Sequence, residues 1–189
     1  GDGEATLLQM HRAIAHRGPD DFGTWNDPEA GVFLGHRRLS IQDLSQSGHQ
    51  PKASITGRYL IAFNGEIYNH LDLRAKLEKM AGFKSWEGHS DTETLLSGIE
   101  FWGLERTLQA AMGMFAIVLW DRRERTLFLA RDRMGEKPLY FGWQGTGEGR
   151  FLLFASELKA LTKHPAFSAK IDRNALTSYV RFAYVPEGV

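Results

Sequence analysis

The chain has 189 residues, 42% of them hydrophobic, and a domain of this length buries roughly 70% of the surface that its unfolded chain exposes. Its 23 basic residues balance its 23 acidic ones, so no net charge attracts nucleic acid, a membrane surface or an acidic substrate. The absence of cysteine excludes disulfides and thiolate metal ligands within this sequence, and the seven histidines lack any HExxH-like spacing.

No segment of the sequence predicts a membrane span or an export signal. The longest apolar run, residues 114–120, is far shorter than the roughly 20 residues that cross a bilayer, and the chain does not open on a charged segment followed by an apolar one. We therefore expect a soluble, cytoplasmic protein without a structural metal, acting on a small ligand.

The first half of the chain alternates predicted helices and short strands. Residues 6–15 carry apolar side chains at helical spacing and stop before Gly18-Pro19, which predicts an opening helix. Two short apolar runs bounded by Gly, Asn or Pro predict buried strands, at residues 32–34 and 59–63.

Two further helices are predicted after the second of these strands. Residues 71–80 repeat leucine between charged residues. The helix Asp91–Trp102 follows Ser90 and has Glu93 three residues after it, which is a capping-box pattern. We expect both to be surface helices that cover a sheet.

The second half of the chain is rich in strands. Four β-prone runs are separated by charged or glycine-rich turns and predict an antiparallel meander, at residues 114–120, 126–130, 139–143 and 152–155. Residues 157–161 predict a short helix, and Arg173–Phe182 predicts another that begins after Asp172, a favourable N-cap. Strand groups flanked by helices favour an α+β fold over an alternating parallel sheet.

The most informative segment is FNGEIYNH at residues 63–70, which combines turn residues, a carboxylate and two side-chain amides directly after a predicted strand. Locally, Asn64-Gly65 predicts a hairpin turn, because both residues tolerate positive φ. A strand that ends in such a cluster also presents polar groups at a sheet edge. The residues alone leave a hairpin and a ligand site open.

Two charged residues elsewhere could complete such a ligand site. Arg38 follows a predicted strand, where a guanidinium can bind a carboxylate through two parallel hydrogen bonds, although alone it is typical of a surface charge. Asp91 begins a predicted helix, where the helix dipole already favours a carboxylate as a cap. Together, one cation and one anion could bind the α-carboxylate and α-ammonium of an amino acid.

Four blocks in this order carry a family resemblance: HRGPD at 16–20, RRLSI at 37–41, FNGEIYNH at 63–70 and SDTE at 90–93. The set resembles the glutamine-hydrolysing domain of asparagine synthases, a class II glutamine amidotransferase of the N-terminal-nucleophile (Ntn) hydrolase type. Other blocks, which we interpret as structural, extend the resemblance over nearly the whole chain, among them GHQP at 48–51. The resemblance implies a four-layer α/β/β/α sandwich of two antiparallel sheets, lacking its first strand.

The resemblance also implies a glutamine pocket. Its residues would be Arg38, Leu39, Ser40, Ile41, Gln42, Asn64, Gly65, Glu66 and Asp91. The Asn64 side-chain amide and the Gly65 N–H would form the oxyanion hole, where donors are held in place before charge develops on the attacked carbonyl. Glycine suits this position because, lacking Cβ, it lets a ligand approach the backbone.

The nucleophile of this family is a cysteine directly after the initiator methionine, with its own α-amine as the base. This sequence has no cysteine, and its first five residues leave no room for the strand that would carry one. We therefore expect residues 1–189 to be an amidotransferase domain incomplete at both ends, inactive alone and without its synthetase domain. The implied partners are L-glutamine and the synthetase domain of the same polypeptide. ATP and Mg²⁺ would bind in that synthetase domain, and no cofactor is implied for the amidotransferase domain. Whether the protein forms a homodimer stays open.

Three functions compete. The favoured one is the glutaminase half of a glutamine-dependent asparagine synthase, which forms a cysteinyl thioester and supplies ammonia to an ATP-dependent amidation. The second is a catalytically silent scaffold domain, as in relatives of β-lactam synthetase; it predicts a degraded pocket, whereas the key residues Arg38, Asn64, Gly65 and Asp91 are present. The third is a glutamine-binding module, which only residues before Gly1 could distinguish cheaply from the first.

Overall fold

The computed structural model describes residues 3–39, 48–83 and 85–186. Its helices are α1 (Gly3–Ala13), α2 (His70–Leu77), α3 (Asp91–Trp102), α4 (Leu104–Ala110), α5 (Leu158–Leu161) and α6 (Arg173–Phe182), with short 3-10 turns at Ala15–Arg17 and Gly147–Gly149. Its strands are β1 (Asp21–Asp27), β2 (Val32–Arg38), β3 (Lys52–Ala53), β4 (Tyr59–Ile67), β5 (Gly113–Asp121), β6 (Thr126–Arg131), β7 (Tyr140–Gln144) and β8 (Phe151–Ala155).

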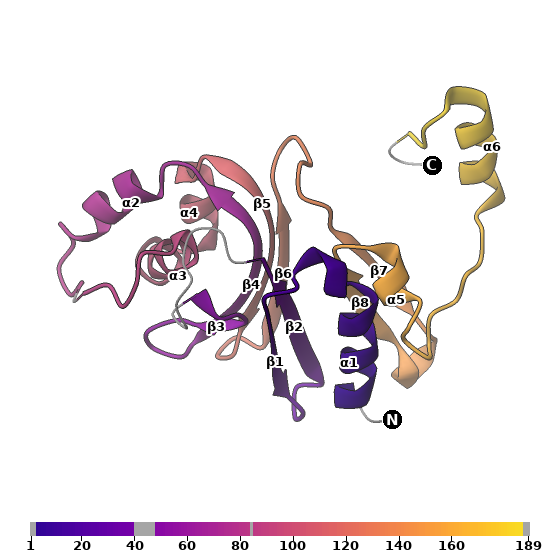
Figure 1. Cartoon of the computed structure of the whole chain (residues 1–189), viewed down its shortest axis with the longest axis horizontal. Coiled ribbons are helices and arrows are strands. Elements are labelled where there is room, and N and C mark those ends of the chain that lie inside the picture. The colour runs from indigo at the N-terminus through magenta and orange to yellow at the C-terminus, as the bar shows by residue number, and fades with distance from the viewer. Residues whose placement is uncertain (1–2, 40–47, 84, 187–189) are drawn as a thin grey trace.

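All of these elements except α6 form four layers, and α6 lies apart from them (Figure 1). A four-stranded antiparallel sheet, in the order β3-β4-β5-β6, has helices α2, α3 and α4 on one face. Two antiparallel ribbons, β1–β2 and β7–β8, lie on the other side, with α1 and α5 outside them. The predicted α+β class and the order of layers are confirmed. The second β layer differs from the expected single sheet, because its two ribbons are not hydrogen-bonded to each other within the described residues.

Alternation along β4 separates two hydrophobic cores. Ile61 and Phe63 point into the core under the helices, whereas Leu60 and Ala62 pack with Leu34 of β2 in the core between the β layers. Successive side chains of a strand point to opposite faces. The side chains of Asn64 and Glu66 therefore follow Leu60 and Ala62 towards the ribbons. By the same rule His36 and Arg38 share the face of Leu34, so that the polar ends of β2 and β4 face one another.

The hairpin interpretation of Asn64-Gly65 is wrong. Strand β4 continues to Ile67, with Asn64 opposite Ala116 and Gly65 opposite Phe115 of β5. Gly65 is required because a Cβ there would clash with the Met114 carbonyl of β5. The long partner strand overrides the local turn propensity of the Asn-Gly pair.

Helix α3 has the predicted bounds and Ser90 as its N-cap, but it is not a surface helix. Thr94, Leu95 and Ile99 are at most 1% exposed. Helices α2 and α4 pack against α3, and α4 was not predicted. Helix α6 is confirmed with Asp172 as its N-cap; the other predicted helices and strands are present with shifted ends, whereas β1 and β3 were missed.

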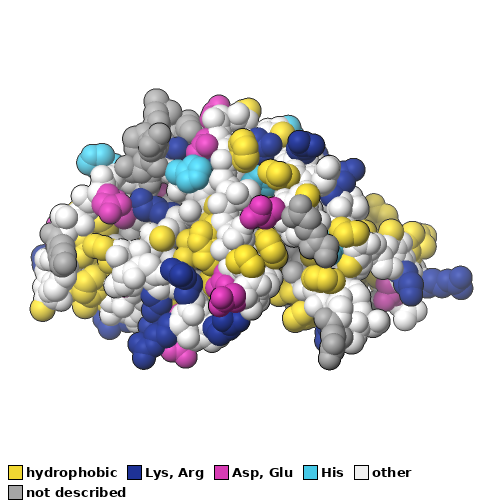
Figure 2. All heavy atoms as spheres, turned by 90° about the horizontal axis from the view of Figure 1, so that it is seen from below, with side chains coloured by type: hydrophobic (Ala, Val, Ile, Leu, Met, Phe, Trp, Pro, Cys, Tyr) yellow, Lys and Arg dark blue, Asp and Glu magenta, His cyan; other side chains and the backbone are white. Residues whose placement is uncertain are grey.

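On the face drawn in Figure 2, acidic and basic side chains are interspersed. Within the described residues, every helix is too short or too polar to cross a bilayer.

The predicted meander is also wrong, because the chain leaves the four-stranded sheet after β6. Asp132 holds this exit: its carboxylate accepts hydrogen bonds from the N–H groups of Glu136 (2.9 Å), Lys137 (3.0 Å) and Phe115 (3.2 Å). Burial works to raise the pKa of Asp132, but these donors outweigh it and the pKa lies below its ordinary value. The turn directs β7 to pair with β8 in the other layer.

Replacing Asp132 by Ala should lower the free energy of unfolding by about 1–3 kcal/mol, because buried N–H groups lose their acceptor. Asp132→Asn, which keeps one acceptor oxygen, should lose less. Because the pKa of Asp132 is depressed on folding, its contribution is present above the ordinary carboxyl pKa and disappears as pH falls through the folded value. Urea unfolding at neutral and acidic pH measures both effects; equal midpoints for wild type and Asp132→Ala at neutral pH would contradict them.

Candidate active site

At the end of β4, the backbone N–H groups of Phe63, Gly65 and Ile67 point towards the β3 side of the strand. Gln50 binds the N–H of Phe63 (2.6 Å), and Asp91 Oδ2 accepts the N–H of Ile67 (2.9 Å). The N–H of Tyr68 points the other way, to the carbonyl of Met112, the residue before β5 (2.7 Å). Alternation therefore turns the N–H of Gly65 towards the β3 side, between the positions of Gln50 and Asp91. Within the described residues, β3 pairs with β4 only at residues 60 and 61.

Asn64 supplies a second donor directly beside Gly65. Its Nδ2 atom is buried and has no acceptor within the described part of the chain. A buried donor left without a partner costs about 1–3 kcal/mol. A ligand that brings an acceptor to this donor would remove that cost and bind more tightly. Consecutive residues of one strand thus offer a side-chain amide and a backbone N–H to an oxygen.

Asp91 adds an anion on the same side of β4. It is the first residue of α3, where the Ser90 side chain accepts the N–H of Glu93 (3.3 Å), and it is 7% exposed. Burial raises the pKa of the Asp91 carboxyl above its ordinary value, although the N–H groups of Ile67 and Thr92 work in the opposite direction. A buried carboxylate that resists ionisation gains most from a cationic ligand group.

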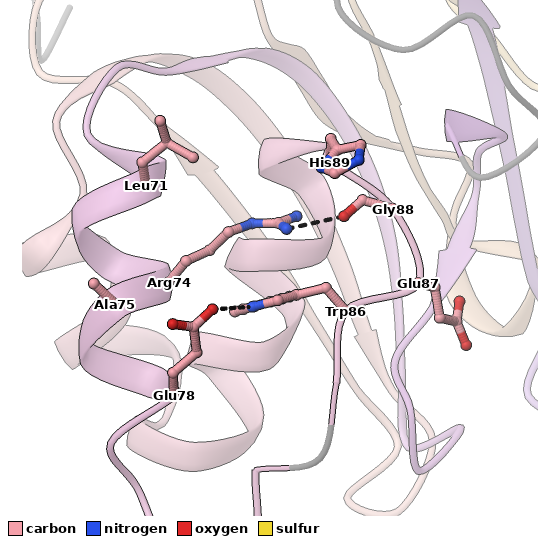
Figure 3. Close-up of a pocket in the computed structure, with 8 residues that line it drawn as sticks. All are labelled: Leu71, Arg74, Ala75, Glu78, Trp86, Glu87, Gly88 and His89. Carbon is pink, nitrogen blue, oxygen red and sulfur yellow. Dashed lines mark hydrogen bonds between the residues drawn. The ribbon is translucent and has the colours of Figure 1, made fainter.

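A buried arginine, missed by the sequence analysis, holds the segment before Asp91 (Figure 3). Arg74 of α2 donates to the carbonyls of Gly88 (2.9 Å) and Ser90 (3.0 Å), and it pairs with Glu93 (3.3 Å). Its guanidinium also lies 4.1 Å from the ring centre of Trp86. The Glu93 carboxylate therefore binds this buried cation and the N–H groups of Glu87 (2.6 Å) and Gly88 (3.0 Å), while the Ser90 side chain caps α3.

The cavity around Arg74 is not the predicted glutamine pocket. It has a volume of about 340 Å³, and its lining residues are Leu71, Arg74, Ala75, Glu78, Trp86, Glu87, Gly88 and His89. None of the predicted site residues that the structure describes lines it. Two of its polar groups bind each other, Trp86 Nε1 donating to Glu78 (2.7 Å).

Arg38 approaches the same end of β4 from the neighbouring layer. It is the last residue of β2, and the Nε2 of His36, two residues earlier, contacts the Phe63 carbonyl (3.0 Å). A Cβ at Gly48 would clash with the Arg38 guanidinium, so this glycine of the GHQP block makes room for the cation. Leu39 is 54% exposed.

The structure thus places Asn64 and Gly65 at the end of β4, next to Asp91 of α3, whose carboxylate binds the Ile67 N–H. Arg38 lies at the adjoining end of β2. Glu66 is half-buried on the face that Asn64 occupies, and its charge helps to raise the pKa of Asp91. The predicted residues Ser40, Ile41 and Gln42 lie outside the described residues. No group of three or more His, Asp or Glu side chains suited to a metal occurs among the described residues.

The four-layer arrangement matches that of a known amidotransferase. The glutamine phosphoribosylpyrophosphate amidotransferase of Bacillus subtilis, solved in complex with ADP and GMP, superposes with a TM-score of 0.58. The match covers 84% of this chain and 40% of that one at 21% identity, which shows a common fold of the Ntn-hydrolase type.

The family is shown by sequence. The model of the glutamine amidotransferase domain matches residues 1–188, and the chain belongs to this family. It is 40% identical over 186 residues to asparagine synthetase [glutamine-hydrolyzing] 1 of B. subtilis (strain 168), and 40% identical over 174 residues to asparagine synthetase [glutamine-hydrolyzing] 3 of the same organism. These matches cover 98% and 91% of the chain but only 28% and 27% of the relatives, so the chain spans less than a third of their length.

Proposed function

We propose that the chain is the glutamine-hydrolysing domain of a glutamine-dependent asparagine synthase. The observation that carries the proposal is the pair of adjacent donors, Asn64 Nδ2 and the Gly65 N–H, in a chain of the glutamine amidotransferase family. Donors aimed at a developing oxyanion are the largest single source of stabilisation in acyl transfer.

In the proposed Michaelis complex, glutamine spans the gap between two charges. Arg38 binds the α-carboxylate through its planar guanidinium, and Asp91 binds the α-ammonium. The side-chain carbonyl of glutamine then lies at Asn64 and Gly65. Because Asp91 is buried, its carboxylate is poorly solvated when no ligand is bound. A cationic ligand group at this carboxylate is therefore favoured over a neutral one.

The proposed nucleophile is a cysteine that precedes Gly1 in the full-length protein, since these 189 residues contain none. Its thiol would form a C–S bond to the amide carbon, and the oxygen would take the negative charge between Asn64 and Gly65. The α-amine of the cysteine would accept the thiol proton and pass it to the leaving nitrogen, which departs as ammonia. Water would then cleave the thioester to glutamate.

The released ammonia would serve an ATP-dependent amidation in a further domain of the same cytoplasmic polypeptide. The names of the B. subtilis relatives support aspartate as the acceptor, and ATP and Mg²⁺ would bind in that domain. A silent scaffold domain is less well supported, because it has no use for a buried amide at Asn64 that lacks an acceptor among the described residues.

The full-length protein should release equal amounts of glutamate and ammonia from glutamine, whereas the 189-residue chain should release neither above the uncatalysed background. Without a thiol, the oxyanion donors have no transition state to stabilise. Coupled assays for glutamate and ammonia measure both proteins. Turnover by the 189-residue chain would contradict the proposed nucleophile, and glutamine binding without turnover by the full-length protein would favour the binding module.

The affinity for glutamine should fall at acidic pH earlier than an ordinary aspartate would predict. The pKa of Asp91 is raised by burial, so this carboxyl loses its charge while pH is still above the usual range. Titrating the dissociation constant of glutamine from neutral to acidic pH measures the effect. Asp91→Asn should bind weakly at every pH and lack this inflection, and an inflection that persists in Asp91→Asn would assign the effect to another group.

A further inference from the structure

We propose that Gln50 and His36 are positioning residues of the oxyanion hole, which together fix the backbone of β4 at Phe63 and keep the N–H of Gly65 uncovered. This inference rests on the proposed function, and it assigns a role to the GHQP block that the sequence analysis interpreted as structural.

Gln50 takes the place of a strand residue at one position of β4. Its Oε1 accepts the N–H of Phe63 (2.6 Å), and its Nε2 donates to the carbonyl of the same residue (3.1 Å). This pair of bonds has the pattern by which a residue of a neighbouring strand binds its partner. Gln50 is 8% exposed, so water competes little for these bonds.

Because Gln50 binds Phe63 through its side chain, the hydrogen-bond ladder between β3 and β4 ends there. A main-chain strand at this position would have extended that ladder along β4. Strand β3 pairs Lys52 with Ile61 and Ala53 with Leu60, so its register would place residue 50 opposite Phe63 and residue 48 opposite Gly65. The main chain lies elsewhere at this point, since the Gln50 carbonyl packs on Gly23 of β1, where a Cβ would clash with it. A continued β3 would have covered the N–H of Gly65.

His36 reinforces the same carbonyl from the other β layer. Its Nε2 lies 3.0 Å from the Phe63 oxygen, and because a carbonyl only accepts, this nitrogen carries the proton. Burial lowers the pKa of His36 to about 4, which keeps the ring neutral at physiological pH. The Phe63 oxygen thus uses both lone pairs, one for Gln50 and one for His36.

These contacts fix the residues on either side of the oxyanion donors. The Phe63 carbonyl belongs to the peptide unit that leads into Asn64, and the Ile67 N–H is bound by Asp91 two residues beyond Gly65. With both flanks bound, the direction of the Gly65 N–H is determined. A misplacement of about 1 Å in such a donor can cost roughly 10²-fold in rate.

The test uses the full-length protein with four variants: Gln50→Leu, His36→Leu, His36→Gln and the control Ser54→Ala. Gln50→Leu and His36→Leu should each lower the glutaminase kcat by roughly 10- to 100-fold with KM changed less than about threefold. His36→Gln can still donate from its amide and should recover most of the rate. Ser54 also binds β4 by a side chain, at Tyr59 N (3.1 Å), but far from Gly65, so Ser54→Ala should keep its kcat.

Two further readouts separate positioning from folding. Synthesis that uses added ammonia should be unchanged in every variant, and amide hydrogen exchange at residue 63 should accelerate in Gln50→Leu only locally. A wild-type protein without glutaminase activity would overturn the proposed function, and the inference with it. An active wild type in which Gln50→Leu and His36→Leu keep their kcat, or lose ammonia-dependent synthesis in parallel, would overturn the inference alone.

Discussion

Asn64→Ala should slow the formation of the glutamyl thioester by roughly 10²–10³-fold in the full-length protein, the loss expected for one oxyanion donor. The affinity for glutamine should barely change, because the donor acts mainly after the carbonyl becomes tetrahedral. The buried Asn64 Nδ2, which has no acceptor within the described residues, is the structural reason for the size of this effect. Single-turnover acylation measures it.

Asn69→Ala is the matched control for this variant. Asn69 also follows β4, but its amide is already used, since it donates to the Ala110 carbonyl (3.0 Å) and accepts the N–H of Met112 (2.9 Å). Its loss should reduce stability and leave the acylation rate intact. Wild-type acylation in Asn64→Ala, with the fold verified by circular dichroism, would remove Asn64 from the site.

Replacing either Arg38 or Asp91, the two charged residues proposed to bind glutamine, by Ala should weaken glutamine binding by about 2–5 kcal/mol, the cost of truncating one partner of a desolvated charge pair. Asp91→Ala should lie towards the upper end, because Asp91 is 7% exposed, whereas Arg38 is only half-buried. Ammonia-dependent synthesis should continue in both variants, because neither residue takes part in the amidation step.

Arg37→Ala is the matched control for Arg38→Ala. Arg37 points to the opposite face of β2, where it donates to the His11 carbonyl (3.3 Å) and lies 4.9 Å from the ring centre of Phe22. The KM for glutamine measured in all three variants should rise in Arg38→Ala and Asp91→Ala and stay constant in Arg37→Ala. A change of less than threefold in Arg38→Ala would return Arg38 to the role of a surface charge.

Local signals predicted the elements whose ends are set by nearby residues. Helix α3 begins where Ser90 and Glu93 form a cap, and α6 begins where Asp172 does so. The Asn64-Gly65 pair shows where such signals fail, because its conformation depends on β5, about 50 residues further along the chain. The polar strand β1 was missed because it has no apolar run; its partner β2 defines it.

Residue types and the family resemblance named candidate site residues but not the framework behind them. Arg38, Asn64, Gly65 and Asp91 were proposed in this way and remain predictions. Arg74 gave no signal, because a lone arginine in a helix is typical of a surface charge. The sequence analysis explained the glycine at position 65 by the approach of a ligand to the backbone. The structure gives a second reason, the close approach of the Met114 carbonyl, which only the pairing of β4 with β5 reveals.

The most direct test is a structure of the full-length protein after reaction with a glutamine analogue that carries an electrophilic ketone in place of the side-chain amide. We predict a covalent adduct on an N-terminal cysteine whose oxygen lies about 2.7–3.1 Å from both Asn64 Nδ2 and the Gly65 nitrogen. Its α-carboxylate should contact Arg38, and its α-ammonium should contact Asp91. An adduct whose oxygen is bound by other donors, with Asn64 and Gly65 left unoccupied, would contradict the placement of glutamine hydrolysis at the end of β4.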